Sequence, residues 1–250
     1  MSPRWPAAAR VFETILTIAG GTALGGAVGL PGGVPLSIAT GVSAGINGAL
    51  GGGRQVYDWR SATGWLAFVA DSTWGLLGTT LGTALHLVNL AHPRPVYRVD
   101  RSRRRNRQVF DRGATLRRGF TFTLGNVVSN ASTGEGTPVD RQRLLDRHEG
   151  LHIWQSRAFG PLYQAVYLAW FVLGLAAGLS TWVVRRGKPS LFRLVETAAY
   201  YDNPFEFWAY KRDDHWEDNR ADPVLKWRRP RWLKRKPAPS SSPPTAPPAA

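Results

Sequence analysis

Two histidines and a glutamate occur together in the segment His148-Glu149-Gly150-Leu151-His152. On a helix, side chains four residues apart lie on the same face, one turn from each other. Imidazole nitrogen is a good zinc ligand, so a histidine pair at this spacing can bind one ion. The glutamate between them would lie beside the ion, where it can accept a proton from water. We therefore predict a metal site with His148 and His152 as ligands and Glu149 as the general base.

The residues around this segment predict a helix. Thr137 is a typical N-cap residue, and Pro138 suits the first helical position. One face of this helix would collect both histidines and several less polar side chains, namely Leu144, His148, Leu151, His152, Gln155 and Phe159. Gly160-Pro161 predicts the end of the helix or a kink. The alternative is an amphipathic helix with two half-buried histidines that bind no metal.

A third metal ligand could come from three places further along the chain. Asn203-Pro204 predicts the start of a helix, which would place Glu206 in its first turns. Glu196 precedes Glu206 by ten residues, and His215 follows it by nine. Residue types and spacing alone leave all three open.

The two segments together resemble the zincin-like metallopeptidases of the gluzincin type. In that family H-E-x-x-H is often followed by a glutamine, here Gln155, and a later helix carries a glutamate ligand. The later motif is often Asn-Pro-x-Glu-x-x-Ala, here residues 203–209. The resemblance covers roughly residues 114–216. It implies that His148, His152 and Glu206 hold Zn²⁺ and that Glu149 is the base.

The composition of the 250-residue chain points to an anionic surface. The net charge is +15, carried mostly by arginine, and there are 11 Trp and no Cys. Without cysteine, disulfides, thiolate metal sites and cysteine nucleophiles are excluded. A basic chain suits lipid headgroups or nucleic acid, and tryptophan is enriched at membrane interfaces.

The basic run 101–107 has no aromatic interleaving and no recognised nucleic-acid motif. We therefore expect no specific nucleic-acid partner, and we interpret the run as lipid-facing or solvated. An arginine-rich module that binds nucleic acid or anionic lipid is the weaker alternative.

Residues 1–62 are predicted to form a glycine-rich membrane hairpin and a connector. Two uncharged arms, 15–30 and 36–53, flank a turn at Pro31–Pro35. Small residues recur at every fourth position of the arms, namely Gly21, Gly25 and Gly29, then Gly41, Gly45 and Ala49. This glycine-zipper spacing lets two helices approach closely in lipid, and each arm is barely long enough to cross a bilayer. A cleaved signal peptide is the alternative for the first arm, and the second arm argues against it.

Residues 63–92 are predicted to form a third apolar helix with a polar stripe. The stripe contains Asp71, Gly75, Gly78, Gly82, His86 and Asn89. Polar and small residues inside an apolar helix should face protein. We favour packing contacts for this stripe over a buried site built on Asp71 and His86.

Residues 93–236 would form the zincin-like domain, with two or three short strands between Gln108 and Ser129. Both flanks of its apolar segment 162–184 are basic, so the positive-inside rule places both on the cytoplasmic face. A zinc ion shared by His148 and Glu206 would also need both flanks on one side. The segment is therefore expected to be re-entrant or to lie in the interface, bent near Gly174 or Gly178. The alternative is that the ligand assignment is wrong. Residues 237–250 contain only Pro, Ser, Ala and Thr, and should form a disordered tail.

Together these patterns predict a mainly α-helical, membrane-embedded fold with a small β element before the H-E-x-x-H helix. The expected function is that of a zinc metallopeptidase of the cell membrane, with membrane lipids as partners. It would hydrolyse peptides or membrane-proximal protein segments by metal-activated water, with Tyr200, Tyr201 or Tyr210 available to stabilise an oxyanion. The alternative is a non-enzymatic glycine-zipper scaffold or channel with structural zinc or none.

Overall fold

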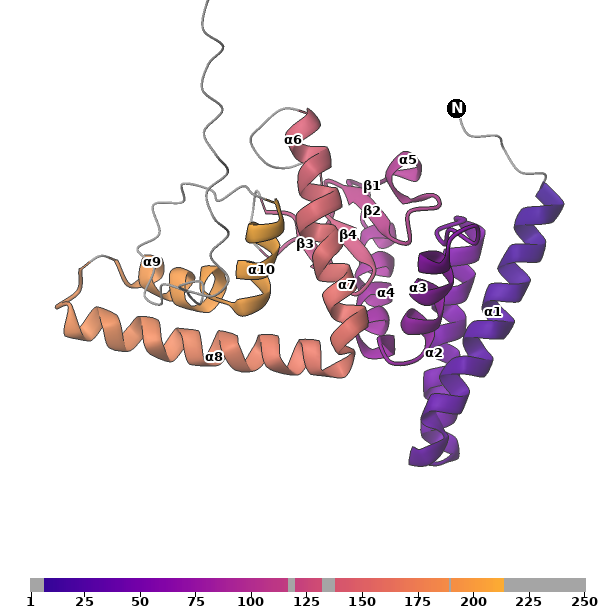
Figure 1. Cartoon of the computed structure of the whole chain (residues 1–250), viewed down its shortest axis with the longest axis horizontal. Helices are drawn as coiled ribbons and strands as arrows, with labels where there is room; N and C mark the ends of the chain where they lie inside the picture. The colour runs from indigo at the N-terminus through magenta and orange to yellow at the C-terminus, as the bar shows by residue number, and fades with distance from the viewer. Residues whose placement is uncertain (1–6, 117–119, 132–137, 189, 214–250) are drawn as a thin grey trace, which may run out of the picture.

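The computed structural model describes residues 7–116, 120–131, 138–188 and 190–213. Thr137, His215 and the predicted tail 237–250 therefore lie outside the described residues. The chain is mainly helical, with one small sheet ahead of the helix that carries the two histidines (Figure 1). The predicted fold class is confirmed to this extent.

The helices and strands follow one another in three groups. The N-terminal group is α1 (Ala7–Gly29), the 3-10 helix η1 (Leu30–Gly32), α2 (Val34–Gly53), α3 (Ala62–Ser72) and α4 (Leu76–Ala91). The middle group is β1 (Val96–Tyr97), α5 (Val99–Ser102), β2 (Gln108–Asp111), β3 (Phe122–Leu124) and β4 (Val127–Ser129). The C-terminal group is α6 (Pro138–Arg143), the π-helical η2 (Leu144–Glu149), α7 (Gly150–Phe159), α8 (Pro161–Val184), α9 (Leu191–Glu196), the π-helical η3 (Thr197–Tyr201) and α10 (Pro204–Asp213).

Helices α1 and α2 form the predicted hairpin, and η1 makes its turn (Figure 1). Small residues let the two backbones meet: a Cβ on Gly25 would lie 2.5 Å from the Thr40 carbonyl oxygen, and one on Gly48 only 2.2 Å from that of Thr17. Thr17 Oγ1 also donates a hydrogen bond to the Gly48 carbonyl, 2.8 Å long. The two backbones approach closely here, with Gly48 rather than the half-buried Ala49 at the contact.

Neighbouring glycines of α1 provide a test of this packing. A methyl group on Gly25 would also lie 2.6 Å from Ala44 Cβ, whereas one on Gly26 would meet Ser37 Oγ at 3.6 Å, an ordinary contact. We expect Gly25→Ala to lower the free energy of unfolding by about 1–3 kcal/mol. Gly26→Ala should be neutral or stabilising by up to about 1 kcal/mol, because alanine is the better helix former. Unfolding in detergent followed by circular dichroism measures both, and equal effects would argue against the contact.

The predicted single helix over 63–92 is wrong, because α3 and α4 are two helices separated at residues 73–75. Thr73 leaves the helical region with φ −131° and ψ −102°. The backbone N–H groups of Thr73 and Gly75 both donate to the Ala70 carbonyl, which closes the end of α3. The six residues of the predicted stripe are nevertheless all buried, so the prediction that the stripe faces protein is confirmed.

The sheet has the strand order β1-β2-β4-β3, with β2 and β4 parallel and the other pairs antiparallel. Side chains of Val109 and Val128 pack with Leu145 and Ile153, which lie on η2 and α7. Another cluster from the sheet packs against Leu85 of α4. The sheet thus lies between α4 and the helix that carries the histidines. The three strands between Gln108 and Ser129 were predicted, and the two-residue β1 was not.

Two arginines of the basic run 101–107 bind other parts of the chain, so the run is not simply solvated. Arg104 donates to both carboxylate oxygens of Glu13, at 2.6 and 2.7 Å, and to the Tyr57 carbonyl. Arg107 is buried and binds Asp146 and the Leu145 carbonyl. The run therefore joins α1 to η2.

Helix α8 continues without interruption through Gly174 and Gly178, so the predicted bend is wrong. A Cβ on Gly174 would lie 2.4 Å from Ala199 Cα, and one on Gly178 would lie 2.6 Å from Val195 Cα. The glycines let α9 and η3 lie against α8 rather than bend it. In the described chain, α8 and the combined α1–η1 segment are the two helices long and apolar enough to cross a bilayer.

Candidate metal centre

The two histidines lie where a π-helical turn passes into α7. His148 belongs to η2 and His152 to the first turn of α7. Such π-helical turns are rare and occur frequently at functional sites. The imidazole ring centroids are 4.9 Å apart, and both side chains are buried. The predicted helix is confirmed, and it ends at Gly160, whose φ of +55° places the next helix in a new direction.

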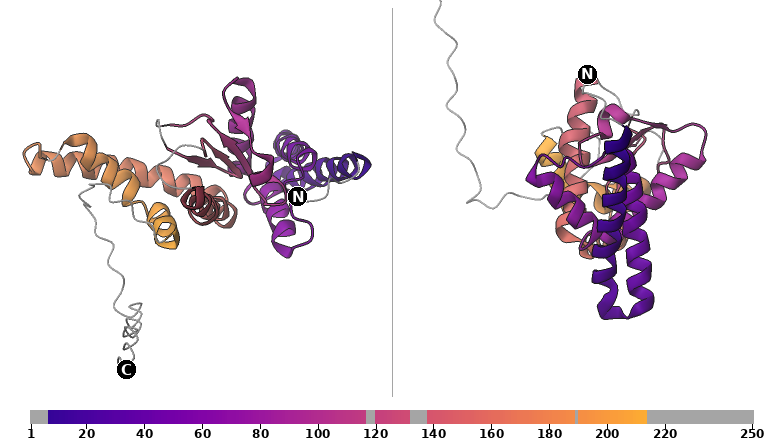
Figure 2. Two further views of the ribbon diagram at one scale, coloured as in Figure 1. Left: turned by 90° about the horizontal axis from the view of Figure 1, so that it is seen from above. Right: turned by 90° about the vertical axis from the view of Figure 1, so that its right-hand side faces the viewer.

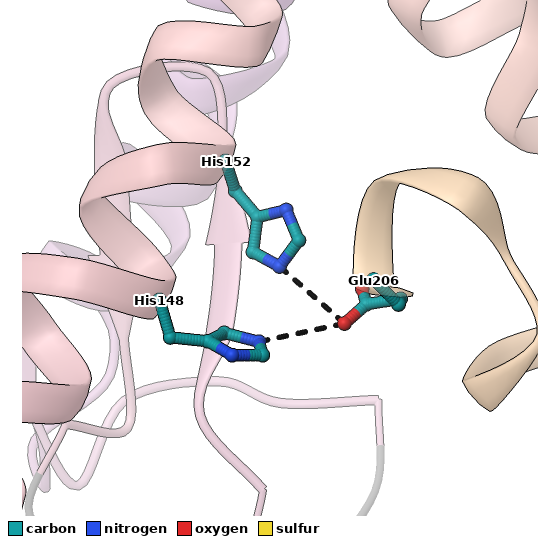
Figure 3. A group of neighbouring side chains, drawn as sticks. All are labelled: His148, His152 and Glu206. Carbon is teal, nitrogen blue, oxygen red and sulfur yellow. Dashed lines mark ion pairs between the residues drawn. The ribbon is translucent and has the colours of Figure 1, made fainter. Parts of the chain in front are cut away.

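Glu206 reaches the histidines from α10 (Figure 3). Pro204 begins this helix, and Asn203 Oδ1 accepts a hydrogen bond from the Phe205 N–H, 3.0 Å away, which stabilises its start. Glu206 Oε2 lies 3.4 Å from Nε2 of His148 and 3.4 Å from Nε2 of His152. The ligand atoms of the three residues all lie within 4.8 Å of one another, and all three residues are buried.

The two distances from Glu206 match those expected around a zinc ion. Ligands placed tetrahedrally about 2.1 Å from an ion are separated from each other by about 3.4 Å. Glu206 Oε2 is buried, and among the described residues no donor forms a regular hydrogen bond with it. A metal cation between this oxygen and the two imidazoles would replace their long contacts with direct ligand bonds.

Neighbouring side chains fix the orientation of the ligands. Gln155 Nε2 donates to the Phe205 carbonyl, so its Oε1 faces His152 Nδ1 at 2.9 Å. Nδ1 then carries the proton, and Nε2 is left to face Glu206. Tyr167 OH donates to Glu206 Oε1, 2.9 Å away, which leaves Oε2 directed at the histidines.

The charges of the group are strongly coupled. Burial lowers the pKa of His152, but the carboxylates of Glu206 and Glu149 and the hydrogen bond with Gln155 together raise that pKa to about 9. Burial raises the pKa of Glu206, yet the imidazoles of His152 and His148 hold it below its usual range. Without a metal, the group therefore keeps a proton at neutral pH. A metal ion must displace this proton, so metal affinity should rise with pH.

Glu149 lies beside the group but is not a member of it. Its side chain is buried, and its Oε2 accepts a hydrogen bond from Thr123 Oγ1 on β3, 2.6 Å long. The sheet thereby holds the predicted base in place.

The other predicted ligands lie elsewhere or outside the described residues. Glu196 ends α9 and does not belong to the group, while His215 is not among the residues that the structure describes. Asp71 pairs with Arg157 at 2.8 Å, and His86 packs against the rings of Tyr97 and Phe110. Asp71 and His86 therefore make packing contacts, which is the interpretation that the sequence favoured over a buried site.

The sequence did not indicate the tyrosines of α8. Tyr163 OH lies 3.4 Å from His152 Nδ1, and Tyr167 binds Glu206. Their spacing of four residues inside an apolar helix was the available signal. Of the tyrosines that were predicted, Tyr210 packs its ring against His148, with centroids 4.6 Å apart.

A separate cavity of about 760 Å³ lies away from the metal centre, between α1 and the residues before and within α3. Its walls are mainly apolar and include Phe12, Leu16, Trp59, Trp65 and Phe68. We base the functional site on the ligand geometry, because neither the histidines nor Glu206 line this cavity.

Comparison with protein families, curated proteins and solved structures finds no match to this chain. The function must therefore be inferred from the side chains of the site itself.

Proposed function

We propose that the chain is a membrane-bound zinc metallopeptidase. The observation that carries the proposal is the position of Glu206 Oε2, which lies 3.4 Å from each of two buried imidazoles. Two neutral histidines and one carboxylate are the ligand set of several zinc hydrolases, and they leave a fourth position open. The resemblance of the two motifs to gluzincins supports the same assignment.

Each residue of the centre would have a defined task in hydrolysis. Bound zinc would act as a Lewis acid that lowers the pKa of water and polarises the peptide carbonyl. Glu149 Oε would take the proton from the attacking water and then deliver it to the nitrogen of the leaving amine. Thr123 would orient this carboxylate, while Gln155 and Tyr167 would keep the ligands aligned.

The expected substrates are peptides or membrane-proximal protein segments. Tyr163 and Tyr167 link the centre directly to α8, an apolar helix of membrane-spanning length. The arginine distribution favours the cytoplasmic face for the centre. A peptidase at the membrane surface would meet segments that emerge from the bilayer.

The direct test is the zinc content of the full chain purified in detergent. We expect about one zinc per chain, which His148→Ala and His152→Ala should each abolish, because two remaining ligands hold zinc poorly. His92→Ala, a change at an exposed histidine outside the group, is the matched control and should retain zinc. Full zinc occupancy in the His148/His152 double variant would disprove the site.

The same measurement identifies the third ligand. Glu206→Ala should weaken zinc affinity by more than the 10–100-fold typical of a residue that only supports a ligand. Glu196→Ala should leave the affinity nearly unchanged, since Glu196 lies outside the group. Competition with a coloured zinc chelator measures both, and the reverse ranking would move the ligand to Glu196.

A structural zinc site in a membrane scaffold is the second candidate function. The close contact of α1 and α2 and the burial of all three ligands favour it. A scaffold would bind zinc through the same residues but would have no hydrolytic activity that depends on Glu149.

A further inference from the structure

Long stretches of the chain carry no charge at the surface. Residues 14–53 and 158–184 contain no acidic or basic side chain, and in 61–91 the one carboxylate, Asp71, is buried. These stretches build α1 to α4 and α8. The charged residues are concentrated in the other elements and at the start of α1.

The uncharged stretches meet at one side of the molecule. In Figure 1 the turn between α1 and α2, the connection between α3 and α4, and helix α8 all lie toward the bottom, while α5, α6 and the sheet lie toward the top. The view from the right in Figure 2 also shows the α1–α2 turn as the lowest point. Each of these three segments has exposed apolar side chains, among them Leu30, Val34 and Leu36 at the α1–α2 turn, Trp74 and Leu77 at the α3–α4 connection, and Leu162 and Leu168 in α8.

The two helices of membrane-spanning length do not share a direction. In Figure 1 α8 runs across the view, whereas α1 and α2 run down it. Spanning helices usually tilt by 0–40° from the bilayer normal. If α1 and α2 point into a bilayer, α8 must therefore lie along it.

Helix α8 has two faces. One face packs on protein through Gly174 and Gly178, and Trp170 Nε1 donates to the Ala198 carbonyl, 3.1 Å away. The exposed row opposite these glycines contains Leu168, Val172, Leu179 and Val183, and apolar side chains beside it are exposed too, namely Leu162, Val166, Phe171, Leu173 and Leu175. The helix carries no charged residue along its length, so its exposed surface suits acyl chains.

The neighbours of α8 argue against a crossing. Elements α9 and η3 lie along it, and α10 joins it through the bond between Tyr167 and Glu206. These elements carry Arg193, and the exposed Lys211 and Arg212. If α8 crossed the bilayer, these charges would be drawn to membrane depth, which is costly.

We infer that the chain docks on one face of a lipid bilayer, with α8 lying in the plane of the interface. The exposed row of α8 contacts acyl chains, and the α1–α2 turn enters the bilayer from the same side. Arg186 and Lys188, which follow α8 directly, suit anionic headgroups. A bilayer is the occupant favoured over a second copy, because the apolar side is formed by three separate segments and extends along the whole of α8. The inference builds on the proposed membrane association but does not depend on the metal.

The depth of single labels in vesicles tests this arrangement. The chain contains no cysteine, so Ala165→Cys, Val172→Cys and Val183→Cys each give one labelling position on the exposed face of α8. A fluorescent label on the full chain would be quenched by lipids with bromine at defined acyl positions, in vesicles of phosphatidylcholine and phosphatidylglycerol. Val99→Cys on α5 is the matched control, since it is an exposed valine on the opposite side.

We expect similar, shallow depths at 165, 172 and 183, a deeper label at Leu36→Cys in α2, and no quenching at 99. A crossing helix would separate 172 and 183 by about 16 Å in depth, because each residue advances 1.5 Å. That result would overturn the inference. Absence of lipid quenching along α8 in vesicle-bound protein would also overturn it, and would indicate a second copy on the apolar face. Zinc content, measured separately, distinguishes this failure from failure of the peptidase proposal.

Discussion

Glu149→Gln should keep its zinc and lose hydrolytic activity by a factor of about 10²–10⁴, the usual contribution of a general base. Glutamine has nearly the same shape as glutamate, and the ligand group does not include this residue. Zinc binding should therefore persist. The amide cannot accept the proton of the attacking water, so the chemical step should fail.

Newly formed peptide termini in cells that produce the wild type or the variant measure this loss across all cellular substrates at once. Glu196→Gln is the matched control, because it removes a half-buried carboxylate outside the metal centre. It should leave the pattern of termini unchanged. Identical termini in wild type and Glu149→Gln would contradict the peptidase and favour the zinc-bearing scaffold.

A large loss of stability is expected when Asp71 is replaced. Its carboxylate accepts two hydrogen bonds from Arg157, both 2.8 Å, one from Tyr57 OH at 3.0 Å and one from Asn126 Nδ2 at 3.1 Å. All four residues are buried, so α3, α7, the segment after α2 and the start of β4 meet at one carboxylate. Asp71→Ala should lower the free energy of unfolding by about 3–5 kcal/mol, because it leaves a buried guanidinium unpaired.

Equilibrium unfolding in detergent measures this effect. The double change Asp71→Leu with Arg157→Met is the informative control, since it removes both charges and keeps apolar volume. The double variant should lower the free energy of unfolding by much less than Asp71→Ala alone. If the two variants are equally destabilised, the loss comes from packing rather than from the unpaired charge.

The grouping of His148, His152 and Glu206 could be predicted largely from the sequence because its determinants are local. The spacing of His148 and His152 fixes their common face on any helix. Asn203-Pro204 starts α10 and thereby places Glu206 in its first turn. That Glu206 rather than Glu196 reaches the histidines depends on how α10 folds back, and only the resemblance to gluzincins indicated it.

The errors arose where contacts between distant segments decide the structure. Gly174 and Gly178 suggested a bend, but their missing side chains make room for α9 and η3. The run at 101–107 looked like a solvated surface, but Glu13 and Asp146 bind two of its arginines. The helix break at Thr73 ends α3 but leaves the polar stripe continuous. The helical spacing of the polar residues therefore could not reveal the break.

The corner at Gly160 has a consequence for the choice of the scissile bond. A Cβ at this residue would lie 2.5 Å from the Trp74 carbonyl oxygen. The connection between α3 and α4 therefore packs directly against the corner where α7 meets α8. His152 precedes Gly160 by eight residues, about 12 Å along α7. If α8 rests on the bilayer and the group binds zinc as proposed, the corner would hold the zinc at a fixed height above the membrane. Cleavage would then follow distance from the membrane rather than amino-acid sequence. Residues inserted next to the membrane anchor of a substrate should move the cleavage site by the same number of residues. Cleavage that stays at the same sequence would exclude selection by distance from the membrane.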